Sequence, residues 1–201
     1  MSVRLVLAAR WLPPFVERWM LDRVARVTNG ALDELLLEHA PGEVARIWAG
    51  EGRLPRRMAA RRAKLAQVHA QRVLALADAL GEERAVELAR ARLFPVGVAL
   101  GKDARRLLGV GNALDEVERA ARVLYRTLGI AFRLDLGPPV RLVVERCALA
   151  PHYGPVTCRA LSAVDEGVLA GLNPYLRMSF ADRLTDGRPA CVAEITRQDE
   201  R

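Results

Sequence analysis

The chain has 201 residues, of which 51% are hydrophobic and 27% charged, a composition typical of an ordinary globular domain. It is long enough to bury a core without disulfides or a structural metal, and disordered, collagen-like and coiled-coil classes are excluded. No run of 18 uncharged apolar residues occurs, so no membrane span is expected. The apolar run at residues 5–9 is too short for a secretory signal. We therefore expect a cytoplasmic protein.

The net charge of +7 resides in the N-terminal two thirds, because residues 131–201 contain nine basic and nine acidic residues. The densest basic window, 53–64, contains no acidic residue. Such a window can bind phosphate or form a solvated helix face. It has no interleaved aromatic residues and no nucleic-acid-binding signature, so we expect a solvated face and no nucleic-acid partner. Its basic residues are Arg53, Arg56, Arg57, Arg61, Arg62 and Lys64.

Residues 1–130 have the pattern of helices divided by Gly and Pro. The opening segment carries Trp11, Phe15 and Trp19 around Pro13 and Pro14, which should break or kink a helix there. We expect the apolar face of this segment to pack on the domain rather than on a membrane surface. Further helices are predicted at 31–39, 56–80, 82–94, 96–108 and 112–128, the last with Asn112 as its N-cap.

At Gly129 the hydrophobic period changes from about 3.6 to 2, which indicates strands with one buried face. Strands 130–136 and 140–147 should pair as an antiparallel hairpin. A short helix over 162–172 and strands at 175–180 and 190–196 complete the prediction. The expected fold is α+β in a single domain, 1–201, with a helical part, 1–129, packed on a small antiparallel sheet in 130–201.

All three cysteines, Cys147, Cys158 and Cys191, lie in the last 55 residues. They can be small packing residues, since free Cys is often buried. With His152 nearby they can instead hold zinc or an iron–sulfur cluster, or one thiol can be a nucleophile with His152 as its base. No Cys-x-x-Cys motif favours a metal. Each cysteine stands near a strand end or a helix start, so we expect all three to converge with Asp165 on one pocket.

Asp165 has two interpretations. It can close a capping box with Ser162 at the start of the short helix. Alternatively, a partly apolar pocket can raise the pKa of this carboxyl and make it a general base. His39 and His69 fall within helical patterns and are interpreted as ordinary helix residues.

The order of several features in 147–196 resembles the C-terminal signature of the L-2-amino-thiazoline-4-carboxylic acid hydrolase family. The shared features are two cysteines with ten residues between them, Asp165-Glu166, the Asn173-Pro174 turn, and Gly187-x3-Cys191 entering a strand. The similarity extends more weakly from about residue 95. One position differs, because Arg188 stands where the family has Asp, which reverses a charge beside the signature cysteine.

This resemblance implies hydrolytic opening of the cyclic amidine-like C=N bond of a thiazoline acid, which yields an N-carbamoyl cysteine. Asp165 would act as the base, Cys158 or Cys191 would supply the thiol, and Cys147 would complete the site. Arg159 or Arg188 would anchor the substrate carboxylate.

The same features are also similar to small-molecule-binding domains of the vinyl-reductase type, which often act as sensors rather than enzymes. The alternative to a hydrolase is therefore a non-enzymatic binding module, with the cysteines as packing residues or as ligands of a metal at Cys147, Cys158, Cys191 and His152. In both cases the partner is a small molecule. Assembly as a homodimer is left open.

Overall fold

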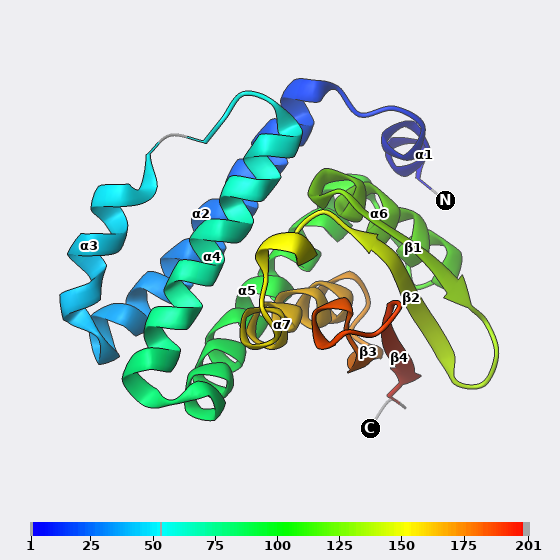
Figure 1. Cartoon of the computed structure of the whole chain (residues 1–201). Coiled ribbons are helices and arrows are strands. Elements are labelled where there is room, and N and C mark those ends of the chain that lie inside the picture. Colours follow the sequence, from blue (N-terminus) through cyan, green and yellow to red (C-terminus); the bar gives the residue numbers. More distant parts are fainter. Residues whose placement is uncertain (1, 53, 199–201) are drawn as a thin grey trace.

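A computed structural model of the chain describes residues 2–52 and 54–198. In these residues helices come first and strands last, with one helix inserted between the second and third strands (Figure 1). This confirms the predicted α+β fold with an N-terminal helical region and a small C-terminal antiparallel sheet. The helices are α1 (Val3–Arg10), α2 (Pro14–His39), α3 (Pro41–Glu51), α4 (Met58–Leu80), α5 (Glu82–Leu108), α6 (Leu114–Leu128) and α7 (Pro155–Leu172). The strands are β1 (Ile130–Asp135), β2 (Val140–Cys147), β3 (Leu176–Asp182) and β4 (Cys191–Arg197), with 3-10 turns η1 (Ala150–His152) and η2 (Leu184–Asp186).

Prolines begin helices more often than the sequence analysis allowed. Pro14 starts α2, so the helix predicted at 31–39 is only the end of a much longer one. Pro41 likewise starts α3, a helix that was not predicted. A proline is tolerated in the first turn because the N–H that it lacks would have no partner within the helix. The predicted break at Pro95 is wrong. This residue lies inside α5 with its ring on the exposed face, where it does not disturb the packing.

Two predicted N-caps are also wrong. Helix α7 begins at Pro155, so Ser162 lies in its interior and its hydroxyl donates to the Arg159 carbonyl at 2.9 Å. Asp165 therefore closes no capping box. Helix α6 has Ala113, not Asn112, as its N-cap residue, and the N–H of Gly111 donates to the Glu116 carboxylate instead.

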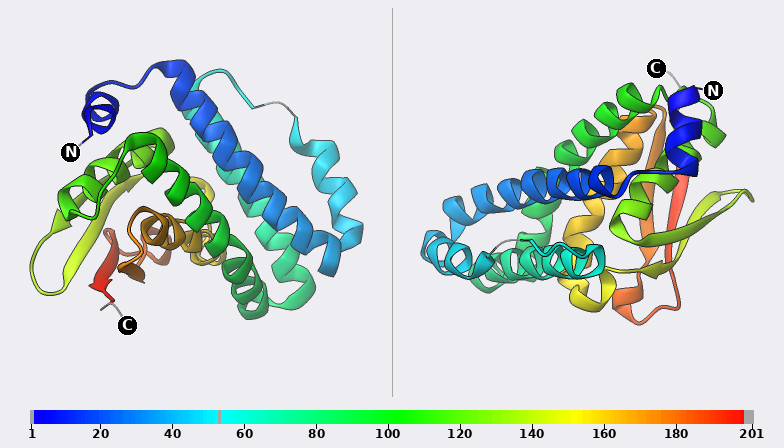
Figure 2. Two further views of the ribbon diagram at one scale, coloured as in Figure 1. Left: turned by 180° about the vertical axis from the view of Figure 1, so that it is seen from behind. Right: turned by 90° about the horizontal axis from the view of Figure 1, so that it is seen from above.

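The molecule has three layers. Helices α2 and α4 run side by side on one side, the sheet lies on the other, and α5 and α7 lie between them (Figures 1 and 2). Buried Arg72 of α4 joins the first pair through Nε and Nη2, which donate to the two oxygens of Asp33 on α2 at 2.7 and 3.1 Å. Such a bidentate pair fixes the register of the two helices.

Four glycines bring α5 and α7 into backbone contact. Gly97 and Gly101 of α5 face Gly167 and Gly171 of α7, so the two helices run parallel at the crossing. A Cβ placed on Gly97 would lie 2.2 Å from the Val164 carbonyl oxygen. Only residues without a side chain permit this approach, which holds α7 firmly against α5.

The sheet is antiparallel throughout, with strand order β1-β2-β4-β3. The hairpin of β1 and β2 was predicted from the alternating pattern. Cys191, Ala193 and Ile195 of β4 lie on the buried face, as the alternation predicts. This placement sets Cys191 opposite Val144 of β2.

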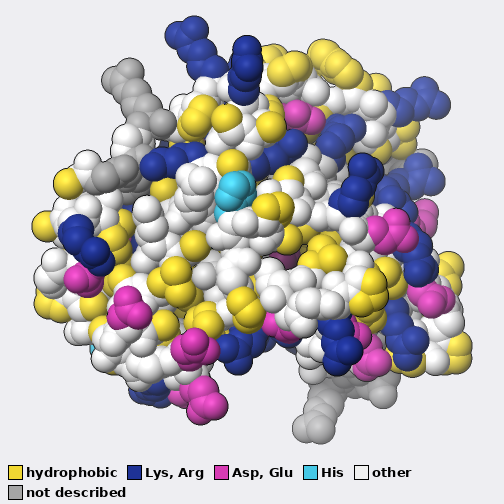
Figure 3. Space-filling model, in the orientation of Figure 1, with side chains coloured by type: hydrophobic (Ala, Val, Ile, Leu, Met, Phe, Trp, Pro, Cys, Tyr) yellow, Lys and Arg dark blue, Asp and Glu magenta, His cyan; other side chains and the backbone are white. Residues whose placement is uncertain are grey.

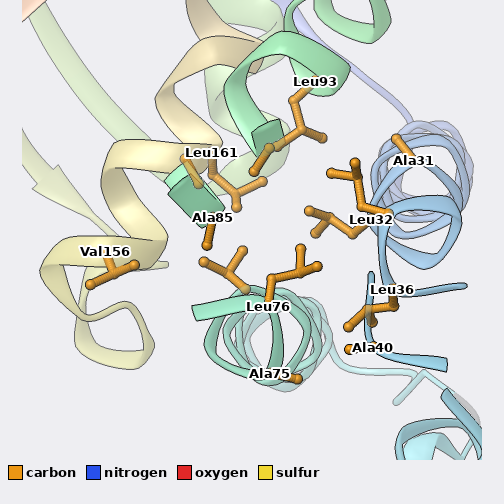
Figure 4. Packing of buried hydrophobic residues seen from close by; sticks show 14 of the residues in the cluster. Ala31, Leu32, Leu36, Ala40, Ala75, Leu76, Ala85, Leu93, Val156 and Leu161 are labelled. Atoms are coloured by element: carbon orange, nitrogen blue, oxygen red, sulfur yellow. The ribbon is translucent and has the colours of Figure 1, made fainter. Parts of the chain in front are cut away.

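Two main hydrophobic cores lie on either side of the α5–α7 layer. The first packs α2, α3, α4 and α5 around the beginning of α7 (Figure 4). The second packs α1, α6 and the sheet around the end of α7. Both cores thus use α5 and α7, and two cavities border these helices and their neighbours.

The opening segment does not pack wholly on the domain as expected. Leu5 of α1 is buried, whereas Trp11, Phe15 and Trp19 are all more than half exposed. Among the described residues, no helix combines the length and the apolar character that crossing a membrane requires.

Candidate functional site

A cavity of about 90 Å³ lies between α7, the helix pair α2–α4 and the end of the sheet. All three cysteines and Asp165 line it, which is the convergence that the sequence analysis expected. We call it the cysteine cavity. Its polar lining residues are Thr28, His69, Tyr125, Cys147, Tyr153, Cys158, Ser162, Asp165, Arg183, Thr185 and Cys191, and the others are Val24, Leu65, Leu128, Ile130, Val144, Leu149, Ala150, Leu161, Val164, Phe180 and Leu184.

The three thiols come from three different elements. Cys147 ends β2, Cys158 lies in the first turns of α7, and Cys191 begins β4. All three are free, with no disulfide between them. The backbone N–H of Leu184 donates to the Cys191 sulfur at 3.3 Å.

Burial keeps these thiols protonated. It raises the pKa of Cys158 to about 11, although the hydroxyl of Thr185 acts in the opposite direction. Burial also raises the pKa of Cys147 and of Cys191, partly offset by backbone N–H groups that donate to each sulfur. Because the thiolate is the nucleophile and the metal ligand, the unliganded cavity holds three weakly reactive thiols.

Asp165 points from the middle of α7 toward Tyr125 of α6. The Tyr125 hydroxyl donates a hydrogen bond to this carboxyl, and burial with the neighbouring charge of Glu166 raises the pKa of Asp165 to about 7. The residue keeps some accessible area, which we attribute to the cavities it borders. Asp165 can therefore exchange a proton near neutral pH, which few carboxyl groups do.

Glu166, the next residue, is part of a different arrangement. Its carboxylate accepts from Nη2 of Arg90 on α5 at 2.7 Å, and it does not line the cavity. Nη1 of Arg90 donates to the Ser162 hydroxyl at 3.0 Å. Glu166 thus fixes α7 to α5, while Asp165 faces the cavity.

A chain of hydrogen bonds links the cavity to the helix pair. The Thr28 hydroxyl donates to the Val24 carbonyl at 2.8 Å, so it must accept from Nε2–H of His69 at 2.7 Å. Nδ1 of His69 then accepts from the Tyr153 hydroxyl, also at 2.7 Å. Burial and the charge of Arg72 lower the pKa of His69 to about 3, so this imidazole is neutral.

Arg183 is the arginine that lines the cavity. Its Nη2 lies 3.4 Å from the Ser162 hydroxyl, its guanidinium stacks on Phe180, and its buried Nε has no hydrogen-bond partner. The Arg183 charge lowers the pKa of Cys158 and Cys191 in part, whereas the Asp165 charge raises the pKa of Cys147 and Cys191. The cavity thus has a cationic side and an acidic side.

Three predicted site residues lie outside this cavity. Arg188 is exposed and pairs with Asp182 at 3.3 Å, and Arg159 reaches outward to Glu82 at the same distance. Neither residue lines the cavity, and each side chain is paired with an acidic residue outside it. His152 lies in η1 next to Tyr153 without lining the cavity. Within the part of the chain that is described, no three His, Cys, Asp or Glu side chains are arranged to hold a metal ion.

The basic window is only partly a solvated face. Arg53 lies outside the described residues, and Arg56 and Arg57 are exposed. Arg61, in contrast, makes a bidentate bond to Asp22, with both distances 2.7 Å. Arg62 donates to the carbonyls of Arg126 and Thr127 at the end of α6, where a cation complements the helix dipole. These two arginines therefore hold helices together.

Searches against family models, curated proteins and solved structures find no match for this chain. The resemblance stated from the cysteine signature thus remains a prediction.

Sequence reasoning missed His69, Tyr125, Tyr153 and Arg183. The two tyrosines carry no spacing signal, because their hydroxyls meet partners from distant helices. The position of Arg183 in the sequence was a usable signal, because this residue lies eight residues before Cys191 in the same loop-and-strand segment as Arg188. Choosing between them required the direction of each side chain, which the loop geometry sets.

Proposed function

We propose that the cysteine cavity binds a small molecule that carries one anionic or hydrogen-bonding group. The observation that carries this proposal is the composition of its wall, in which neutral thiols and aliphatic side chains surround one cation, Arg183, and one titratable carboxyl, Asp165. A few convergent polar groups in an otherwise apolar concavity are the usual features of a ligand site. We place binding ahead of catalysis because the raised pKa of each thiol disfavours a nucleophilic role.

Arg183 is the residue that we assign to the anionic group. Its buried Nε has no partner, so a ligand oxygen would satisfy a donor that is otherwise unpaired. Asp165, which is hydrogen-bonded to Tyr125, would donate a hydrogen bond to the ligand or accept one from it on the side of the ligand away from Arg183. A ligand between them would be oriented by its two polar contacts and enclosed by the thiols.

A second candidate function is hydrolysis of a thiazoline-type cyclic acid. The observation that favours it is the pKa of about 7 at Asp165, which suits a group that takes a proton from water and returns it to a ring nitrogen. In this version Arg183 takes the role of carboxylate anchor that was assigned to Arg159 or Arg188. The thiols would exclude bulk water rather than attack.

Calorimetry and product analysis with 2-amino-thiazoline-4-carboxylate test both candidates. For the binding function, Arg183→Gln should weaken binding at least tenfold, since it removes a charge-assisted bond. The matched control Arg188→Gln changes an exposed arginine outside the cavity and should bind like the parent protein. The proposal is wrong if neither 2-amino-thiazoline-4-carboxylate nor the corresponding carboxamide binds. It is also wrong if Arg183→Gln and Arg188→Gln bind the acid with equal affinity.

Turnover separates the two functions. Asp165→Asn should abolish release of N-carbamoyl cysteine if the protein is a hydrolase, while leaving measurable binding of the acid. Binding without turnover by the parent protein, at pH values on both sides of 7, would leave the binding module as the function.

A further inference from the structure

A second cavity, larger than the first, lies between α2, α5 and α6. It has a volume of about 240 Å³ and its wall is almost wholly apolar. Leu100, Ala104, Leu124 and Val168 are among the residues that line it. We call it the apolar cavity. Neither the signature cysteines nor Arg183 reach it.

The two cavities share a wall. Val24, Tyr125, Leu128, Val164 and Asp165 line both of them. The hydrogen-bonded pair of Tyr125 and Asp165 therefore stands at the junction, with thiols and Arg183 on one side and aliphatic side chains on the other. Three of the five shared residues are aliphatic, so a hydrocarbon group that crosses this wall would contact mainly aliphatic side chains.

The apolar cavity reaches the surface at the beginning of α2. Trp19 and Leu107 line it and are 52% and 54% exposed. Trp11 and Phe15, also exposed, lie just before Trp19 in the chain. Hydrophobic side chains gather along the upper edge of the molecule in Figure 3, where α1 and the beginning of α2 lie in Figure 1. The mouth is thus apolar.

Charge differs sharply between the two cavities. Apart from Asp165, the charged residues at the apolar cavity are Arg23 and Asp103, which form an ion pair with each other. A charged group would gain no partner there and would lose its hydration. In the cysteine cavity Arg183 offers an unpaired donor. A ligand that fits both must carry its charge at one end.

We propose that the two cavities form one site for an amphipathic monocarboxylate, with the carboxylate at Arg183 and a hydrocarbon chain passing Tyr125 and Asp165 into the apolar cavity. This inference rests on the proposed binding function and extends it to a class of ligand. It explains why the cysteine cavity is small: at about 90 Å³ it has room for a head group of a few heavy atoms.

The test is calorimetric titration of the full chain with straight-chain carboxylates from butanoate to dodecanoate. Affinity should rise about fourfold for each added methylene until the apolar cavity is full. Alcohols of equal length should bind at least tenfold more weakly, and Arg183→Gln should remove that difference.

A matched pair of variants locates the chain. Ala104→Phe fills part of the apolar cavity and should weaken dodecanoate binding at least tenfold while leaving butanoate binding unchanged. Ala99→Phe is the same change in the same helix on the exposed side and should have no effect. If circular dichroism shows that Ala104→Phe does not fold, Val16→Phe near the mouth replaces it.

The outcomes distinguish the two proposals. Butanoate binding with no gain from longer chains, or equal dodecanoate binding by both α5 variants, overturns the inference and leaves the cysteine cavity as a binding site. Equal binding of alcohols and carboxylates, unaffected by Arg183→Gln, overturns the placement of the carboxylate at Arg183. If no carboxylate binds at all, both proposals fail.

Discussion

Protonation of Asp165 should couple the stability of this protein to pH. The pKa of Asp165 is about 7 in the folded protein, whereas an unperturbed Asp titrates near 3.8. Between these two pH values the folded chain therefore holds a proton that the unfolded chain has lost. The resulting stabilisation is complete below pH 4 and is lost as the pH rises to 7. We expect the free energy of unfolding to fall, relative to Asp165→Asn, by up to about 1.4 kcal/mol per pH unit between pH 5 and 7.

Urea denaturation of both proteins at pH 5, 6, 7 and 8 measures this difference. His69 acts in the opposite direction, because its lowered pKa makes stability rise with pH up to about 6.5. Both proteins retain His69, so its effect cancels in the comparison. A difference that does not change with pH would show that Asp165 is ionised in the folded protein.

The chain from Thr28 to Tyr153 offers a second residue-scale prediction. Thr28→Val leaves Nε2–H of buried His69 without an acceptor and should cost about 1–3 kcal/mol of unfolding free energy. Thr157 is equally buried, but its hydroxyl has no hydrogen-bond partner. Thr157→Val should therefore be neutral or slightly stabilising, as measured by thermal and urea denaturation. Equal losses in both variants would contradict the hydrogen bond at His69.

The candidate site could be predicted in part from single residues. Cys147, Cys158, Cys191 and Asp165 were expected to converge, and they do, because strand ends and one helix face meet beside α7. His152 was considered because it is near the cysteines in sequence, and Arg159 and Arg188 because of the family resemblance. Neither ground gives the direction of a side chain, and both arginines pair with acidic residues outside the cavity. His69 was missed because a buried imidazole within an α-helical pattern resembles a core residue.

At the scale of elements, the parallel crossing of α5 and α7 sets the geometry of the site. Gly97→Ala would place a Cβ within 2.2 Å of a backbone oxygen that no side-chain rotation can move, so the helices must separate. We expect a loss of about 1–3 kcal/mol or more. Gly30→Ala, also within a helix, meets nothing within 4 Å and should stabilise by about 0.5–1 kcal/mol. Urea denaturation checks both; a stable Gly97→Ala would mean that the crossing is looser than described.

Most elements were predictable from periodicity, and several of the misses involve proline. Strands 130–136 and 140–147 were found because a period of 2 follows directly from one buried face. Pro95 was taken as a break because local rules describe an isolated helix. Helix α5 continues beyond the proline, where Gly97 packs against α7, and this tertiary contact is invisible in the local sequence.

At the scale of the molecule, the two main cores should unfold together. Val156, Ala160 and Leu161 of α7 belong to the first core, and Leu169 and Leu172 belong to the second. One rigid helix in both cores leaves no boundary along which they could separate. We expect a single calorimetric transition whose van't Hoff and calorimetric enthalpies agree. Two resolved transitions would indicate two independent units.

The shared helix also has a consequence for the order of events during synthesis. Helices α2 to α5 leave the ribosome before α7, yet the first core includes the beginning of α7. Until α7 emerges, the surfaces of α4 and α5 that α7 covers in the folded protein stay exposed, and two strands of the sheet are made in the interval. The nascent chain therefore passes through a stage with a long exposed apolar surface, a stage at which a holding chaperone would bind and from which α7 would displace it.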